Sequence, residues 1–187
     1  MTSRLRFLTA RQVFETFPAA LDDIAIEPTD DPPLDFLRAA ESAGAHDDGI
    51  AFCAYLLPRR EAVWWACQCL RGMGVLTSER DFEALAAAES WVRSPEEENR
   101  RAALDLAQRL PPAEPSTWLA FSAAWTGGSM VSAEFEPVLP PPHLTAKAVR
   151  AALTLALGRV DPRTRDDLAA RCVASCIRFA DGGDATF

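Results

Sequence analysis

Residues 56–73, LLPRREAVWWACQCLRGM, combine a long apolar run with a few polar positions, and the rest of the fold is expected to be organised around them. Between Ala62 and Leu70 only Gln68 is polar, so a helix here would be apolar over most of its circumference. Pro58 suits the start of that helix because proline lacks a backbone N–H, and the N–H groups of the first turn have no partner within a helix. Gly72 and Gly74 favour the end of the helix. A helix apolar on most sides is normally surrounded by others, so residues 58–73 are predicted to form the central helix. Its polar positions share one narrow stripe: Arg60, Glu61, Gln68 and Arg71.

The remaining apolar positions also follow helical periodicity. Residues 130–135 offer the only possible short strand. Most of the intervening loops are short, which favours antiparallel neighbours. We therefore predict an all-α fold: a single-domain irregular helical bundle or array of about eight helices around a central apolar helix. That domain spans residues 1–187, with a proline-rich irregular connector at 129–143 and a loose tail at 181–187. The surrounding helices are expected at 10–17, 34–43, 50–57, 78–93, 95–110, 117–126, 146–157 and 162–180.

Polar residues ahead of several apolar stretches predict where the helices begin. Ser94 is interpreted as an N-cap, Pro95 as the first helical residue, and Glu97 as the second half of a capping box. The sequence HDDG at residues 46–49 predicts a turn. Further N-caps are predicted at Thr9, Ser116, Thr145 and Asp161.

The composition argues against a nucleic-acid-binding, membrane-spanning or secreted protein. The chain has 187 residues, of which 49% are hydrophobic, and 19 basic against 27 acidic residues give a net charge of −8. That sign opposes binding to phosphate backbones, so no nucleic-acid partner is expected. No segment reaches the ~20 apolar residues that span a bilayer, and the N-terminal residues lack the pattern of a secretory signal. A cytoplasmic protein without membrane insertion is predicted.

The five cysteines are expected to be reduced thiols that pack in the core. On a helix, Cys67 and Cys69 would point about 200° apart, which does not suit one zinc ion. Cys172 and Cys176 share a face, but that face is apolar, and metal or redox chemistry is kept only as the minor alternative. No metal and no cofactor are predicted.

Catalytic signatures are missing from the sequence, so an enzyme is not predicted. The histidines, His46 and His143, both lie in predicted loops and could act as bases only if the fold supplied a partner. The acidic pairs are interpreted as solvated or as complementing helix dipoles, although the sequence leaves open whether they converge. These pairs are Asp22–Asp23, Asp30–Asp31, Asp47–Asp48 and Asp166–Asp167.

Trp64 stands apart from the core pattern. It falls in the polar stripe between Arg60 and Gln68, whereas Trp65 points toward apolar neighbours. An exposed Trp beside Arg is typical of a protein-binding hot spot, with burial under another segment as the alternative. The connector supplies a second candidate surface, because polyproline segments are common recognition elements. The candidate binding residues are Arg60, Trp64, Gln68, Pro140, Pro141, Pro142 and His143.

Three motifs carry a family resemblance: LPRREAVWWACQC, AWTGGS and PPPHLTAKAV. With the intervening residues, about 57 to 157, they resemble an uncharacterised family of small helical bacterial proteins met near type VI secretion genes in Gram-negative genomes. The resemblance implies a cytoplasmic accessory, adaptor or chaperone-like protein that handles a secreted component. It brings no catalytic residues with it.

The leading hypothesis is therefore a non-enzymatic protein-binding adaptor. One alternative is an immunity protein that neutralises a basic toxin, which the acidic charge would suit. A less favoured alternative is an enzyme whose site is assembled from loop residues such as His46, Asp47 and His143. A structural subunit of a larger assembly would instead form oligomers in isolation.

Overall fold

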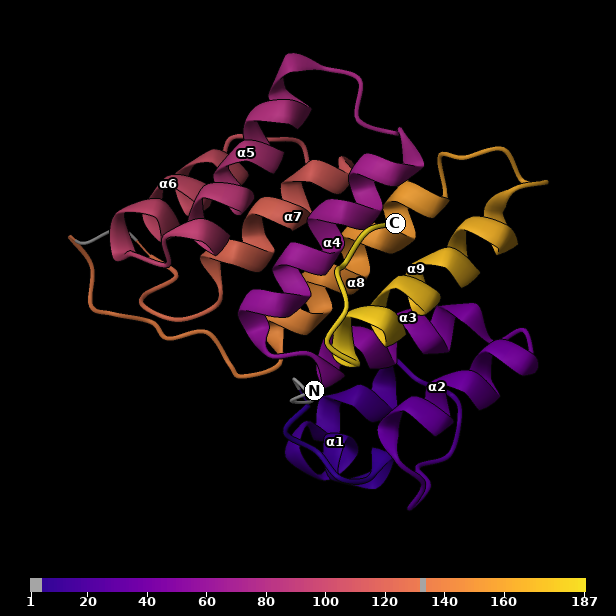
Figure 1. Cartoon of the computed structure of the whole chain (residues 1–187). Coiled ribbons are helices and arrows are strands. Elements are labelled where there is room, and N and C mark those ends of the chain that lie inside the picture. Colours follow the sequence, from indigo (N-terminus) through magenta and orange to yellow (C-terminus); the bar gives the residue numbers. More distant parts are fainter. Residues whose placement is uncertain (1–4, 132–133) are drawn as a thin grey trace.

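The structure is a computed structural model that describes residues 5–131 and 134–187. The described residues contain helices and connecting segments but no β-strand, which confirms the predicted all-α class. In chain order the elements are α1 (Ala10–Thr16), the 3₁₀ helix η1 (Pro18–Asp22), α2 (Pro33–Ser42), α3 (His46–Leu56), α4 (Arg59–Met73), α5 (Glu79–Arg93), α6 (Glu97–Ala107), α7 (Pro115–Ala124), α8 (Leu144–Leu157) and α9 (Arg165–Ala180) (Figure 1).

Helix α4 has the central position that its apolar circumference predicts. It packs against α3, α5, α7, α8 and α9, and Figure 1 shows it between α5 on one side and α9 on the other. Pro58 is its N-cap residue, and it ends at Gly74, whose φ of +66° is left-handed. Glycine adopts that conformation without steric cost, so the stop follows from the sequence.

Helix α3 begins four residues earlier than expected. The predicted turn at residues 46–49 is wrong, because His46 to Gly49 form the first turn of α3. Gly49 is buried, and a Cβ atom there would lie 3.0 Å from Val173 on α9. Close packing of the two helices therefore outweighs the weak helix propensity of glycine, while Asp47 and Asp48 complement the positive end of the helix dipole.

The capping box predicted at Ser94 and Glu97 is also wrong. Ser94 is the C-cap of α5, and α6 begins at Glu97, whose carboxylate pairs with arginines. The capping box is instead at the start of α5, where Ser78 and Asp81 exchange hydrogen bonds. Both segments place an acidic residue three positions after a serine, so the sequence pattern alone could not separate them.

Three further predicted N-caps, Ser116, Thr145 and Asp161, are wrong, because the N-cap residues of α7, α8 and α9 are Glu114, His143 and Thr164. Ser116 lies inside α7 and donates to Asp81 (2.6 Å), and Thr145 lies inside α8 and donates to the Trp125 carbonyl (3.0 Å). Helix α9 starts at Arg165, three residues after Pro162, because Asp161 accepts hydrogen bonds from Arg163 in the preceding turn. In each case a tertiary or loop partner competes with the cap.

The C-terminal tail, which the sequence predicts to be loose, contacts α4 and α9. The ring of Phe187 occupies the space beside Gly72 on α4, where any Cβ atom would overlap it. Arg171 stacks on that ring at 4.4 Å, and Arg178 donates to the Thr186 carbonyl (2.5 Å). Gly72 therefore serves packing within α4 rather than termination.

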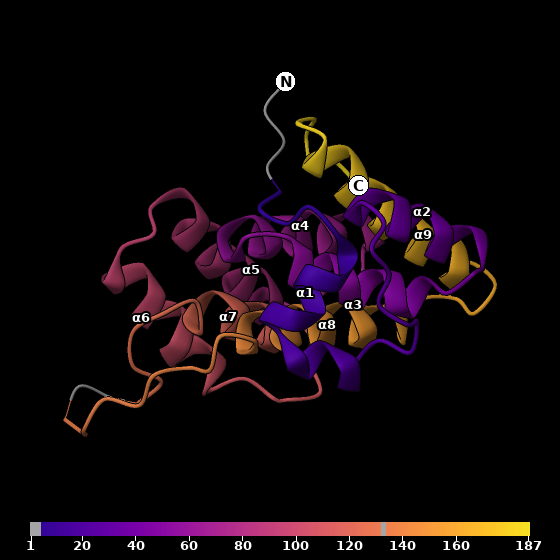
Figure 2. The same ribbon diagram turned by 90° about the horizontal axis from the view of Figure 1, so that it is seen from below.

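The connector at residues 129–143 contains turns, bends and irregular backbone in its described part. The possible strand at 130–135 lies partly outside the described residues, and its described members form none. Instead, the Met130 amide donates to the Val138 carbonyl (2.8 Å), which closes the connector into a loop. Figure 2 shows this loop projecting beyond α6 and α7. None of the described helices combines the length and apolarity needed to cross a bilayer.

Candidate functional site

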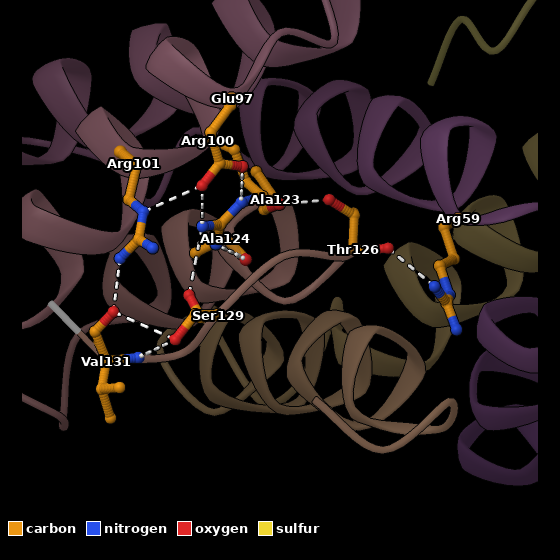
Figure 3. Close-up of polar contacts among 9 residues, drawn as sticks. All are labelled: Arg59, Glu97, Arg100, Arg101, Ala123, Ala124, Thr126, Ser129 and Val131. Carbon is orange, nitrogen blue, oxygen red and sulfur yellow. Dashed lines mark hydrogen bonds and ion pairs between the residues drawn. The ribbon is translucent and has the colours of Figure 1, made fainter. Parts of the chain in front are cut away.

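Arg59 joins the three sequence motifs. Arg59 belongs to the first motif. Its guanidinium donates to the carbonyl of Thr126 in the second motif, AWTGGS (2.6 Å), and to the carbonyl of Pro142 in the third motif, before α8 (3.4 Å). Figure 3 shows the bond to Thr126. Thr145, from the third motif, also donates to the Trp125 carbonyl. Segments far apart in the sequence therefore meet at the start of α4, where they hold both ends of the connector.

Arg100 holds the connector from the other side. Its side chain is buried, and it donates to the carbonyls of Ala124 (2.7 Å) and Ser129 (3.1 Å) (Figure 3). Its charge is balanced by Glu97, which accepts two hydrogen bonds of 2.6 Å from it. These hydrogen bonds from Arg100, followed by those from Arg101, lower the pKa of Glu97 to about 2. Arg101 also donates to the Val131 carbonyl.

The connector beyond this base exposes apolar side chains. We call residues 134–142, EFEPVLPPP, the arm. Phe135 is 61% exposed, Val138 48% and Leu139 69%. The Ser129 hydroxyl accepts from the Val138 amide (3.2 Å), so the exposed residues are tied to the arginine-held base. Exposed apolar residues gathered on one segment are typical of an interaction surface.

A groove opens beside Trp64, between α4, α5 and α9. We call it the Trp64 groove; its volume is about 390 Å³ and it is lined by Arg60, Glu61, Trp64, Val92, Arg93 and Phe179. That volume lies within the ~300–1,000 Å³ usual for ligand pockets. Aromatic and aliphatic surface forms its walls, and three charged side chains stand among them.

Trp64 differs from its neighbour Trp65. Trp65 is fully buried, and its indole N–H donates to the Ser175 hydroxyl (2.9 Å) and the Cys172 carbonyl (3.1 Å). Trp64 is only partly buried, and its indole N–H has no hydrogen-bond partner among residues 5–131 and 134–187. Trp64 thus presents an apolar face and a free donor to whatever enters the groove.

The groove arginines are held by the fold. Arg60 donates to the carbonyl of Val92 (2.6 Å), which lies near the end of α5. Arg93 donates to Glu89 (3.1 Å), which is only 5% exposed and also accepts two bonds from Arg71 (2.8 and 2.9 Å). Because Glu89 is shared between two arginines, Arg93 keeps positive charge available at the rim of the groove.

The candidate binding residues divide into two places. Arg60 and Trp64 meet in the groove, whereas Gln68 is not among its lining residues. Pro140, Pro141, Pro142 and His143 lie outside it, on the path from the arm into α8. The sequence analysis missed Val92, Arg93 and Phe179, because they come from other helices and no local pattern links them to Trp64.

His46 and Asp47 do share a pocket, together with Asp48, Arg165 and Asp166. Two of the acidic pairs thus contribute to one place. His143 is not among the residues lining it, so the loop-built site considered from the sequence is not assembled as proposed. Within residues 5–131 and 134–187 no group of three His, Cys, Asp or Glu side chains has a metal-binding arrangement.

Four cysteines from three helices meet in the core. Cys53 interacts with Cys176, and Cys69 with Cys172, while Cys67 lies apart from them; all five thiols are free and buried. Burial first, and the neighbouring thiols second, raise the pKa values of Cys53 and Cys69. Thiols kept protonated are poor nucleophiles, so the geometry supports packing rather than redox chemistry.

Comparison with known proteins identifies the family of this chain. A family model described as "Family of unknown function (DUF6931)" matches residues 36–180. The chain belongs to this family. The matched region of DUF6931 contains all three motifs, the Trp64 groove and the arm, and the family description assigns no activity. No curated protein and no solved structure matches the chain.

Proposed function

We propose that this DUF6931 protein is a non-enzymatic adaptor that binds a protein partner through the Trp64 groove. The observation that carries the proposal is Trp64 itself, a partly exposed indole with a free N–H group that lines the groove together with Arg60 and Arg93. Trp and Arg dominate the binding energy of protein interfaces when they lie in a pocket that a partner can desolvate.

The groove favours one kind of partner segment. Its walls suit an aromatic or aliphatic side chain, and its two arginines against one Glu61 favour carboxylates beside that side chain. A basic toxin would place like charge against Arg60 and Arg93, so this surface does not favour the immunity role. The sequence resemblance supports the further proposal that the partner belongs to a type VI secretion system.

The test compares two aromatic substitutions. The tagged full-length chain, Trp64→Ala and Phe82→Ala would each be used to capture partners from the native host, with mass spectrometry as the readout. Phe82 is exposed on α5 and does not line the groove, so Phe82→Ala is a matched control. Titration of the purified partner against each variant would then give the affinities.

We expect one stoichiometric partner that Phe82→Ala retains and whose affinity for Trp64→Ala falls at least about tenfold. A partner that binds Trp64→Ala as tightly as the unmodified chain would contradict the groove assignment. Circular dichroism of both variants would show that the fold is unchanged.

A further inference from the structure

We propose that the arm of one copy of this chain docks in the Trp64 groove of a second copy. The inference rests on the proposed function, because it names an occupant for the same groove. It follows from the complementary chemistry of the two surfaces.

The arm carries an anchor with charge on both sides. Phe135 is flanked by Glu134 and Glu136, and all three side chains are exposed. Val138 and Leu139 extend the apolar surface toward the prolines. An aromatic side chain between two carboxylates has the chemistry that the groove favours.

The groove offers the opposite pattern. Trp64 supplies partly exposed apolar surface, with the nearly buried Val92 and Phe179 beside it, and Arg60 and Arg93 supply positive charge against one Glu61. The chain as a whole has a net charge of −8, so this positively charged groove differs in sign from the molecule around it. The groove is therefore complementary to the acidic arm of a second copy. A carbonyl or carboxylate oxygen of the arm would also give the free Trp64 indole N–H an acceptor.

Hydrogen bonds and prolines restrict the backbone of the arm before it binds. Arg59 holds the Pro142 carbonyl, and Ser129 holds the Val138 amide. Pro137 and Pro140 to Pro142 further limit its backbone, so less conformational entropy is lost on binding. The arm projects beyond α6 (Figure 2), and none of its residues lines the groove of its own copy.

This contact would be head-to-tail, since arm and groove are different surfaces. Each copy then keeps one free arm and one free groove, and association continues into open chains or closes into a ring. The apparent mass should therefore rise with protein concentration.

Sedimentation velocity over a range of concentrations tests the proposal with two variants. Phe135→Ala removes the anchor but keeps the groove, and Trp64→Ala removes the groove anchor but keeps the arm. Each alone should weaken self-association at least about tenfold. Mixed together they should form a dimer, through the intact arm of one and the intact groove of the other. Phe82→Ala should associate as the unmodified chain does.

The free peptide EFEPVLPPP provides a second measurement. It should bind the unmodified chain, dissociate its oligomers and fail to bind Trp64→Ala. A monomer at all concentrations, or a mixture of the two variants that stays monomeric, would overturn the inference. If the host partner then still binds the unmodified chain and Phe135→Ala but not Trp64→Ala, the adaptor function stands without self-association.

Discussion

The guanidinium of Arg100 lies 2.7 Å from the point where a Cβ atom on Gly128 would be. Gly128 also has a φ of +63°, in the left-handed region that side chains rarely adopt. A buried arginine from α6 and a glycine after α7 thus require each other. Together they set the direction in which the chain leaves α7 and enters the arm.

Gly128→Ala should destabilise the protein by about 3 kcal/mol, because backbone strain and overlap with Arg100 act together. Urea unfolding followed by circular dichroism would measure the loss. Gly127→Ala is the matched control: its Cβ atom would meet nothing within 4 Å and its φ is not left-handed. Equal losses in the two variants would show that Arg100 does not restrict the site.

The two adjacent tryptophans should respond differently to substitution. Trp65→Phe should cost about 2 kcal/mol, because the change leaves the buried Ser175 hydroxyl without its N–H donor and creates a cavity. Trp64→Phe should change the unfolding free energy by less than about 0.5 kcal/mol. Denaturant unfolding of both variants would check this, and a larger loss at Trp64 would mean that its role is structural.

Stability should fall in acid, with Asp23 contributing to the loss. Burial opposes ionisation of this carboxyl, but hydrogen bonds from Tyr55 and Lys147, with the charge of Arg150, outweigh it, so its pKa is lowered. The unfolded chain therefore binds more protons, and this stabilisation is lost as pH falls below about 4 through the folded pKa.

Glu97 acts in the same direction, through a pKa of about 2, although its 58% exposed side chain is screened by solvent. Melting temperatures measured from pH 7 to pH 2.5 would show the decline. Asp23→Asn should melt lower at pH 7 and lose less between pH 4 and pH 2.5. An unchanged acid dependence in Asp23→Asn would contradict the assignment.

The five cysteines should be unreactive while the chain is folded. All are buried, and burial raises the pKa of Cys53, Cys67 and Cys69. A chromogenic disulfide reagent at pH 8 should label them only as the protein unfolds, and all five should react in guanidinium chloride. Rapid labelling of the native protein would reveal an accessible thiolate and reopen the question of redox chemistry.

The all-α class and the central helix could be predicted from the sequence, because local periodicity sets which face of a helix must be buried. Helix α4 is apolar over most of its circumference, which favours a position surrounded by other helices, and Gly74 ends it through backbone geometry that acts within a few residues. The position of Trp64 in the polar stripe could also be predicted from the sequence, because helical geometry fixes its angle around the helix axis relative to Arg60 and Gln68.

Which polar side chains cap helices and which form hydrogen bonds elsewhere depends on contacts between segments that are remote in the sequence. Ser116 and Thr145 match the N-cap pattern, but Asp81 and the Trp125 carbonyl, both remote in sequence, supply their partners. The same holds for the groove, in which Arg93 and Phe179 join Trp64 from two other helices. Hydrogen bonds and pockets depend on distances between segments, and hydrophobic periodicity along one segment carries no information about those distances.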